Sequence, residues 1–238
     1  MRRICCILLL FFAPAARGQV LISLVFGKYL NSGKVEFGLD GGMNLSNLAG
    51  LKEGDSHIQK LNLGFYFDIK LKKPEWMFHT GVIVKSTMGS GKLDVYPTGD
   101  HSLDSLMSGG HINRKINYFN VPLAIKYITP VRLFFEGGLM PGLRYTAIDE
   151  FTNSVNGQDL SYKNDIRSDL TRLDLGILSG IGYRITKGNG INLAIRYYRG
   201  LIDITKNDDT GVYNQSIYFA VEIPIGVGKS KNPQSTAP

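Results

Sequence analysis

Cysteine is almost absent from this chain. Its two cysteines, Cys5 and Cys6, both lie close to the N-terminus. A disulfide framework and a thiolate metal site are therefore excluded for the rest of the sequence. A chain without further cysteines is also compatible with an oxidising compartment such as the periplasm.

Long apolar runs and a strong excess of one charge are also missing. Past Leu30, no apolar run approaches the roughly 18 residues of a transmembrane helix. The formal net charge of +7 over 238 residues includes Arg2, Arg3 and Arg17, and seven minus these three leaves +4. The basic residues alternate with apolar ones instead of clustering, so we expect no nucleic-acid partner.

Histidine is scarce, and its spacing predicts no chemistry. The four histidines are His57, His79, His101 and His111, and only His79 falls within a predicted strand. No histidine pair has zinc-site spacing, and no His, Ser and carboxylate cluster as a hydrolase or acyltransferase requires. The segment Met88–Lys92 resembles a phosphate loop, but Ser86 stands where the first glycine is needed. We therefore predict no enzyme, no catalytic residue, no metal and no cofactor.

The N-terminus has the layout of a secretory signal peptide. Two arginines precede an apolar run from Ile4 to Ala13, and small residues follow at Ala16 and Gly18. We predict a signal peptide over 1–18 and a periplasmic leader over 19–33, in which residues 20–30 can form either a short helix or an extra strand. The alternative is an uncleaved anchor.

The stretch from Ile116 to Tyr145 shows the dominant pattern of the chain. It predicts two strands separated by Thr129-Pro130, each with apolar residues at every second position. The opposite face mixes charges with glycines, and each strand is as long as the roughly 9–11 residues that cross a bilayer. This indicates a transmembrane β-hairpin.

The same alternation predicts eight strands and hence an all-β fold, an eight-stranded antiparallel up-and-down transmembrane β-barrel over 34–227. The strands are expected near 34–45, 58–70, 75–87, 116–128, 131–145, 169–185, 190–202 and 213–227. Short links alternate with long polar ones, as in membrane barrels. Both termini are then periplasmic, with a flexible tail over 228–238, and we expect a monomer in the outer membrane.

Aromatic residues are predicted to form two girdles on the lipid face. Phe67, Trp76, Phe78, Tyr127 and Tyr183 lie near the periplasmic ends of their strands, and Phe119 and Tyr145 lie near the outer ends.

The polar face is expected to line the barrel interior. Its charged residues are Glu36, Asp40, Asp68, Lys85, Lys126, Arg132, Glu136, Arg144, Arg172, Asp174, Arg184, Arg196 and Glu222. An eight-stranded barrel has an interior that side chains just fill, so these charges must pair. A closed salt-bridge network is the structural interpretation, and a narrow polar conduit is the functional alternative. A lipocalin-like soluble barrel would instead turn the apolar face inward around a ligand.

Four segments resemble the PorT-like outer membrane β-barrel family of Bacteroidota-type bacteria: GKVEFGLDGGMNLSNL, NYFNVPLAIKYI, FFEGGLMPG and LDLGILSGIGYRI. The resemblance spans roughly 33–227 and implies an eight-stranded outer membrane barrel with no catalytic residues. The founding member is tied to secretion of cell-surface proteases, which implies a structural or interaction role in the cell envelope. Partners besides outer membrane lipids would be envelope or secretion proteins, bound through loops 88–111 and 148–168 or the periplasmic termini. The alternative function is a small pore. Unlike most outer membrane barrels, the chain continues beyond its last strand.

Overall fold

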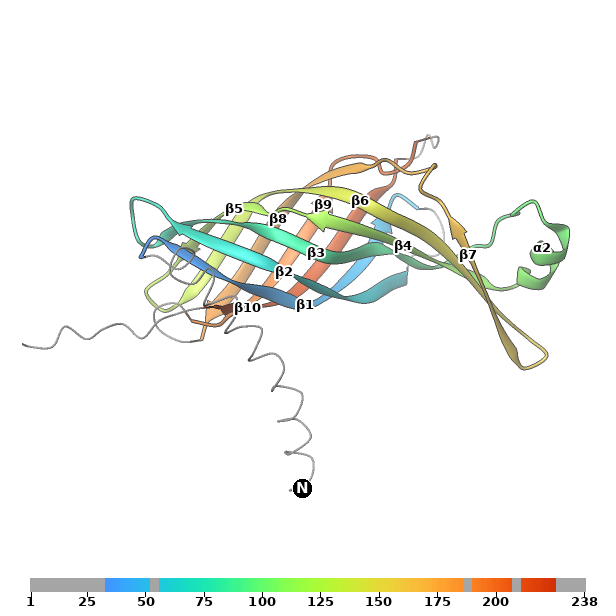
Figure 1. The fold of residues 1–238 in the computed structure, drawn as a ribbon, viewed down its shortest axis with the longest axis horizontal. Coiled ribbons are helices and arrows are strands. Elements are labelled where there is room, and N and C mark those ends of the chain that lie inside the picture. The colour runs from blue at the N-terminus through green and yellow to red at the C-terminus, as the bar shows by residue number, and fades with distance from the viewer. Residues whose placement is uncertain (1–32, 52–55, 186–189, 207–210, 226–238) are drawn as a thin grey trace, which may run out of the picture.

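The computed structural model describes residues 33–51, 56–185, 190–206 and 211–225, which form a closed antiparallel β-barrel (Figure 1). The strands are β1 Val35–Ala49, β2 Ser56–Lys70, β3 Trp76–Leu93, β4 His111–Asn120, β5 Leu123–Ile128, β6 Leu133–Val155, β7 Gln158–Asp165, β8 Leu173–Arg184, β9 Asn192–Gly200 and β10 Tyr213–Pro224. The helix is α2 His101–Met107. β1 pairs with both β2 and β10, so the sheet closes on itself.

Two of the ten strands share one position in the ring. β4 and β5 both lie between β3 and β6, and β7 pairs with β6 alone. The break between β4 and β5 falls at Val121 and Pro122, because a proline has no N–H to donate to the ladder. The wall of the barrel is therefore eight-stranded, as the alternation predicted, and the predicted fold class is confirmed.

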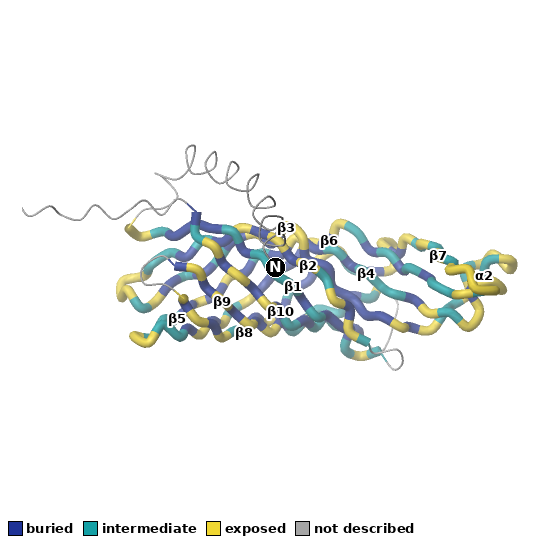
Figure 2. The backbone as a smooth tube through the Cα atoms, turned by 90° about the horizontal axis from the view of Figure 1, so that it is seen from below, coloured by how far each residue is buried: buried dark blue, intermediate teal, exposed yellow. Residues whose placement is uncertain are grey.

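Apolar side chains cover the outside of the barrel, and buried and exposed positions alternate along its strands (Figure 2). On β8 the exposed apolar positions run from Leu173 to Tyr183. These residues span ten steps along the strand, each with a rise of about 3.3 Å. With a strand tilt of about 40° they give an apolar belt roughly 25 Å high, which matches the lipid-facing apolar band of membrane barrels. The lipocalin-like alternative, with the apolar face inward, is wrong.

Aromatic residues lie at both edges of this belt. At the edge with the short turns, Trp76 and Tyr127 pack with ring centroids 4.8 Å apart. At the opposite edge, Phe119 and Tyr145 stack at 4.5 Å. The rings therefore occupy the two interface levels that such side chains favour.

The segments 88–111 and 148–168 are not the plain loops expected. β3 continues to Leu93, β4 begins at His111, and β6 continues to Val155 before pairing back with β7. We call residues 89–115 and 148–165 the extension, because they continue the sheet beyond the belt and carry α2 between β3 and β4 (Figure 1).

The predicted signal peptide, the leader or short helix of residues 20–30 and the tail over 228–238 all lie outside the described residues. Within the described part, no helix has the length and apolar character needed to cross a membrane.

Candidate functional site

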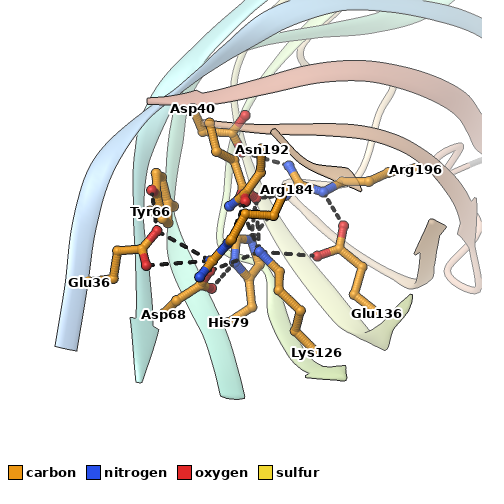
Figure 3. Close-up of polar contacts among 11 residues, drawn as sticks. Glu36, Asp40, Tyr66, Asp68, His79, Lys126, Glu136, Arg184, Asn192 and Arg196 are labelled. Carbon is orange, nitrogen blue, oxygen red and sulfur yellow. Dashed lines mark hydrogen bonds and ion pairs between the residues drawn. The ribbon is translucent and has the colours of Figure 1, made fainter. Parts of the chain in front are cut away.

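Nine ionisable side chains from eight strands meet inside the barrel, near the short-turn end (Figure 3). We call them the charged cluster: Glu36, Asp40, Asp68, His79, Lys126, Glu136, Arg184, Arg196 and Glu222. Each occupies an inward position of its strand, since neighbouring residues point to the lipid. All nine are buried, so their charges are compensated by one another and not by water.

Lys126 lies at the centre of the charged cluster. Its Nζ is 2.9 Å from Asp68 Oδ2 and 3.0 Å from Glu222 Oε2, and it is 3.8 Å from Glu136 Oε2. Its side chain is fully buried. One cation from β5 therefore joins acids of β2, β6 and β10 across the barrel.

Arg196 forms a second centre and shares Glu136 and Glu222 with Lys126. Its guanidinium contacts Asp40 at 2.7 Å and also ion-pairs with Glu136 and Glu222. Three carboxylates of three strands therefore depend on one side chain of β9. Arg184, also near the short-turn end, is 3.4 Å from Glu36.

His79 bridges acid and base within the charged cluster. Its Nδ1 is 2.6 Å from Asp68 Oδ1, and its Nε2 is 3.3 Å from Arg196 Nη2. A guanidinium nitrogen can only donate, so Nε2 accepts and Nδ1 carries the proton that is donated to Asp68. In this tautomer His79 orients Asp68 and has no free acceptor for general-base chemistry.

A metal site is the other chemistry that this geometry suggests. Within the described residues, ligand atoms of Asp40, His79 and Glu222 lie within 4.8 Å of one another. However, Arg196 already ion-pairs with both carboxylates, and Lys126 also binds Glu222. A divalent cation would have to displace two permanent cations, so the donor set fits an ion-pair network and not a metal.

Tyrosines form the next interior layer toward the extension. Tyr198 donates to Asp174 at 2.9 Å, and Asn214 donates to both Asp174 at 2.7 Å and Tyr118 at 3.0 Å. Tyr218 hydrogen-bonds Ser86 at 3.1 Å. These bonds satisfy the hydroxyl groups of buried rings that would otherwise be costly to desolvate.

Above the tyrosines, apolar side chains fill most of the interior, together with a few buried polar ones such as Ser46 and Ser90. The buried cluster there contains Leu48, Met88, Ile116, Ala147, Ile166, Leu170, Ile204 and Val212. Segment 166–171 is held across this end by Arg144, which donates to the carbonyl oxygens of Arg167 at 2.9 Å and Thr171 at 3.0 Å. The barrel is therefore filled in three successive layers: charged, tyrosine-rich and apolar.

The structure buries ten of the residues predicted for the interior and places three elsewhere. The buried ones are Glu36, Asp40, Asp68, Lys126, Glu136, Arg144, Asp174, Arg184, Arg196 and Glu222. Lys85 is exposed because the register shifts between Leu63–Lys85 and Gly64–Ile83, so that Val84 and Lys85 both point outward.

Arg132 and Arg172 are also corrections to the predicted network. Arg132 lies in the turn before β6 with φ 71°, where it contacts the ring of Tyr183 at 5.2 Å. Arg172 precedes β8 and is exposed. In both cases the predicted strand began before the observed one, so the alternation was extended into a turn or loop.

Three members of the interior network were not among the predicted site residues. They are Tyr66, His79 and Asn192, and each lies on the predicted polar face. Tyr66 donates to Glu36 at 3.0 Å, and Asn192 donates to Glu222 at 2.6 Å. Their positions on the polar faces of the predicted strands could have identified them as interior residues.

The extension has a core of its own. Leu93, Met107, Ile112 and Phe151 are buried together, with Tyr96, Leu103, Leu160 and Tyr162 packed against them. Arg114 binds Asp149 through two hydrogen bonds of 2.8 and 2.7 Å, and Tyr96 donates to the same carboxylate at 3.0 Å. Burial raises the pKa of the Tyr96 hydroxyl to about 12. The extension is therefore a packed structure and not a solvated loop.

Comparison with known families agrees with this architecture. A family model described as outer membrane protein beta-barrel domain matches residues 25–206. The chain belongs to this outer membrane β-barrel family. It is thus an outer membrane β-barrel protein, and no curated protein sequence matches it.

Similar solved structures include other outer membrane barrels. Ail of Yersinia pestis is 13% identical with a TM-score of 0.41, covering 81% of this chain and 99% of that one. Neisserial surface protein A is 10% identical with a TM-score of 0.39, covering 79% and 96%. CarO of Acinetobacter baumannii is 11% identical with a TM-score of 0.33, covering 77% and 96%.

Proposed function

We propose that this outer membrane β-barrel is a non-enzymatic interaction protein, in which the filled barrel anchors the extension as a contact surface outside the cell. The observation that carries the proposal is the packed core of the extension. A loop that only closes a barrel does not need such a core, whereas a binding surface must hold its side chains in place.

The orientation follows from the same proposal. The short turns and both termini of the chain face the periplasm, after export by the N-terminal signal peptide, and the extension lies outside the cell. This agrees with the usual arrangement of short periplasmic turns and long outer segments. The resemblance to PorT-like proteins favours envelope or secretion proteins as the class of partner.

Helix α2 provides the most distinctive part of this surface. Leu106 is 48% exposed on the extension, away from the apolar belt. Ser102 is exposed one helical turn earlier, so both lie on the same face. Asp100 caps the helix through hydrogen bonds to the N–H groups of Ser102 and Leu103. A capped helix that presents an apolar side chain to water fits a protein contact.

A surface cross-linking experiment tests both orientation and contact. Ser102→Cys should react in intact cells with a membrane-impermeant, photoactivatable maleimide and give one discrete adduct after illumination. Adding Leu106→Asp should abolish the adduct but not the labelling, because the apolar contact is lost while the site stays exposed. The matched control is Lys73→Cys in the exposed β2–β3 turn, which should be labelled only after the membrane is permeabilised. Labelling at Lys73→Cys alone would reverse the orientation, and an adduct unaffected by Leu106→Asp would refute the contact.

A conductance measurement distinguishes the proposed anchor function from the alternative of a small pore. We expect the purified barrel to give no discrete channel openings in planar bilayers, because three layers of buried side chains occupy its interior. An authentic porin inserted under the same conditions serves as the positive control. Stable unitary openings of the wild-type protein would overturn the anchor and support the pore.

A further inference from the structure

A depression with an aromatic wall lies on the outside of the barrel, where the belt meets the extension. Phe119 of β4 and Tyr145 of β6 form the wall, and both rings are more than a third exposed. Arg144, Arg167 and Arg172 line the same depression. An apolar surface thus adjoins three guanidinium groups at the edge of the membrane.

Arg144 is fixed in place, and within the described residues its side chain forms no ion pair with a carboxylate. It is 8% exposed, and its hydrogen bonds go to the carbonyl oxygens of Arg167, Leu170 and Thr171. Neutral carbonyls orient a guanidinium but do not compensate its charge. A buried cation without a carboxylate attracts an anion more strongly than one that water surrounds.

The other two arginines, Arg167 and Arg172, add further positive charge to the depression. Arg167 is paired with Asp165 at 2.6 Å, where both side chains are more than half exposed. The side chain of Arg172 has no hydrogen bond or ion pair within the described residues. Three guanidinium groups therefore face one carboxylate, so the depression has two uncompensated positive charges.

We propose that this depression binds the phosphate headgroup of a lipid from the adjoining leaflet. Guanidinium groups bind phosphate oxygens through paired hydrogen bonds. The acyl chain lies against Phe119 and Tyr145, which continue into the lipid-facing belt. A soluble anion would use only the arginines, whereas an anionic lipid uses the charged and the apolar parts together.

Native mass spectrometry in detergent provides the test, with short-chain phosphatidic acid and phosphatidylcholine of the same chains as probes. The wild-type barrel should retain phosphatidic acid at least about tenfold more strongly than phosphatidylcholine. Each basic residue near a membrane surface strengthens the binding of an anionic lipid by about a factor of five. Arg167→Gln with Arg172→Gln should reduce this preference to about the level of phosphatidylcholine. Both residues are exposed, and the heat-dependent gel shift of the folded barrel verifies folding.

The control removes two positive charges at the other end of the belt. Lys72→Gln with Lys73→Gln, both in the exposed β2–β3 turn, should leave the preference unchanged. Equal retention of the two lipids by the wild type would overturn the proposal, and so would an equal loss in both double variants. Inorganic phosphate should not displace the lipid at comparable concentration. If it does, the site binds anions without regard to the acyl chain, and the lipid assignment is wrong.

Discussion

Replacement of Arg196 by methionine should lower the free energy of unfolding by about 3–5 kcal/mol, the cost of breaking a buried ion pair from one side. Arg196 is the shared partner of Asp40, Glu136 and Glu222. Methionine keeps an unbranched apolar stem in place of the arginine stem, so the main change is the loss of the guanidinium group with its charge and donors. Within the described residues, Asp40 would then have no ion pair, and Glu136 and Glu222 would keep only Lys126 as a cationic partner.

The charge balance of the cluster makes this loss especially costly. Its five carboxylates already outnumber Lys126, Arg184 and Arg196. One oxygen each of Asp40 and Glu136 accepts no hydrogen bond. Because the cluster has an excess of acids, no neighbouring cation is left over to replace Arg196.

The measurement is urea unfolding of the refolded barrel in detergent. Unfolding is monitored by the fluorescence of Trp76 and by the gel shift on heating. Arg199→Met is the matched control, since it is the same substitution on the same strand. Arg199 is half-buried and hydrogen-bonds Gln215 at 2.8 Å. We expect its effect to stay below about 1 kcal/mol. Equal losses in the two variants would show that the cluster does not depend on Arg196.

Alternation predicted the barrel and most of the interior because the two faces of each strand meet different solvents. Lipid requires apolar side chains at every second position, so charges such as Lys126 and Glu222 can only point inward. The same constraint does not specify which charges pair. The contact between Lys126 and Glu222 joins strands that are far apart in sequence and depends on the curvature of the closed sheet.

The errors arose where local structure departs from regular alternation. The bulge at Val84 and Lys85 adds one residue to β3. The apolar residues before it still alternate regularly, so the sequence pattern does not reveal the bulge. The extension was interpreted as loops because it lies beyond the lipid, where the apolar alternation weakens. One signal was present: Asn156-Gly157, both with positive φ, forms the tight turn between β6 and β7. An Asn-Gly pair between two candidate strands predicts this hairpin.

Substitution of Gly138 by alanine should have an effect of comparable size, for a steric reason. A Cβ at Gly138 would lie 2.1 Å from the carbonyl oxygen of Leu123 and 2.5 Å from the Cα of Ala124. Both atoms belong to the backbone of β5, so no rotation of a side chain can relieve the contact. The strands must separate where Gly138 pairs with Ala124. We expect a loss of about 3 kcal/mol, at the upper end of overpacking costs, or failure to refold.

The neighbouring Gly137 provides the control. It is also a glycine of β6, but a Cβ added to it would point to the other face of the strand. Its added Cβ would have only the carbonyl oxygen of Leu178 nearby, at 4.0 Å, and it points out of the barrel. Gly137→Ala should therefore be neutral or stabilise by about 0.5 kcal/mol, since glycine is the less favourable residue in a strand. Urea unfolding and refolding yield of both variants decide the matter. If Gly138→Ala refolds with unchanged stability, β5 and β6 do not approach as closely as the structure shows. If both variants fail equally, the cause is the loss of glycine itself and not contact across the strands.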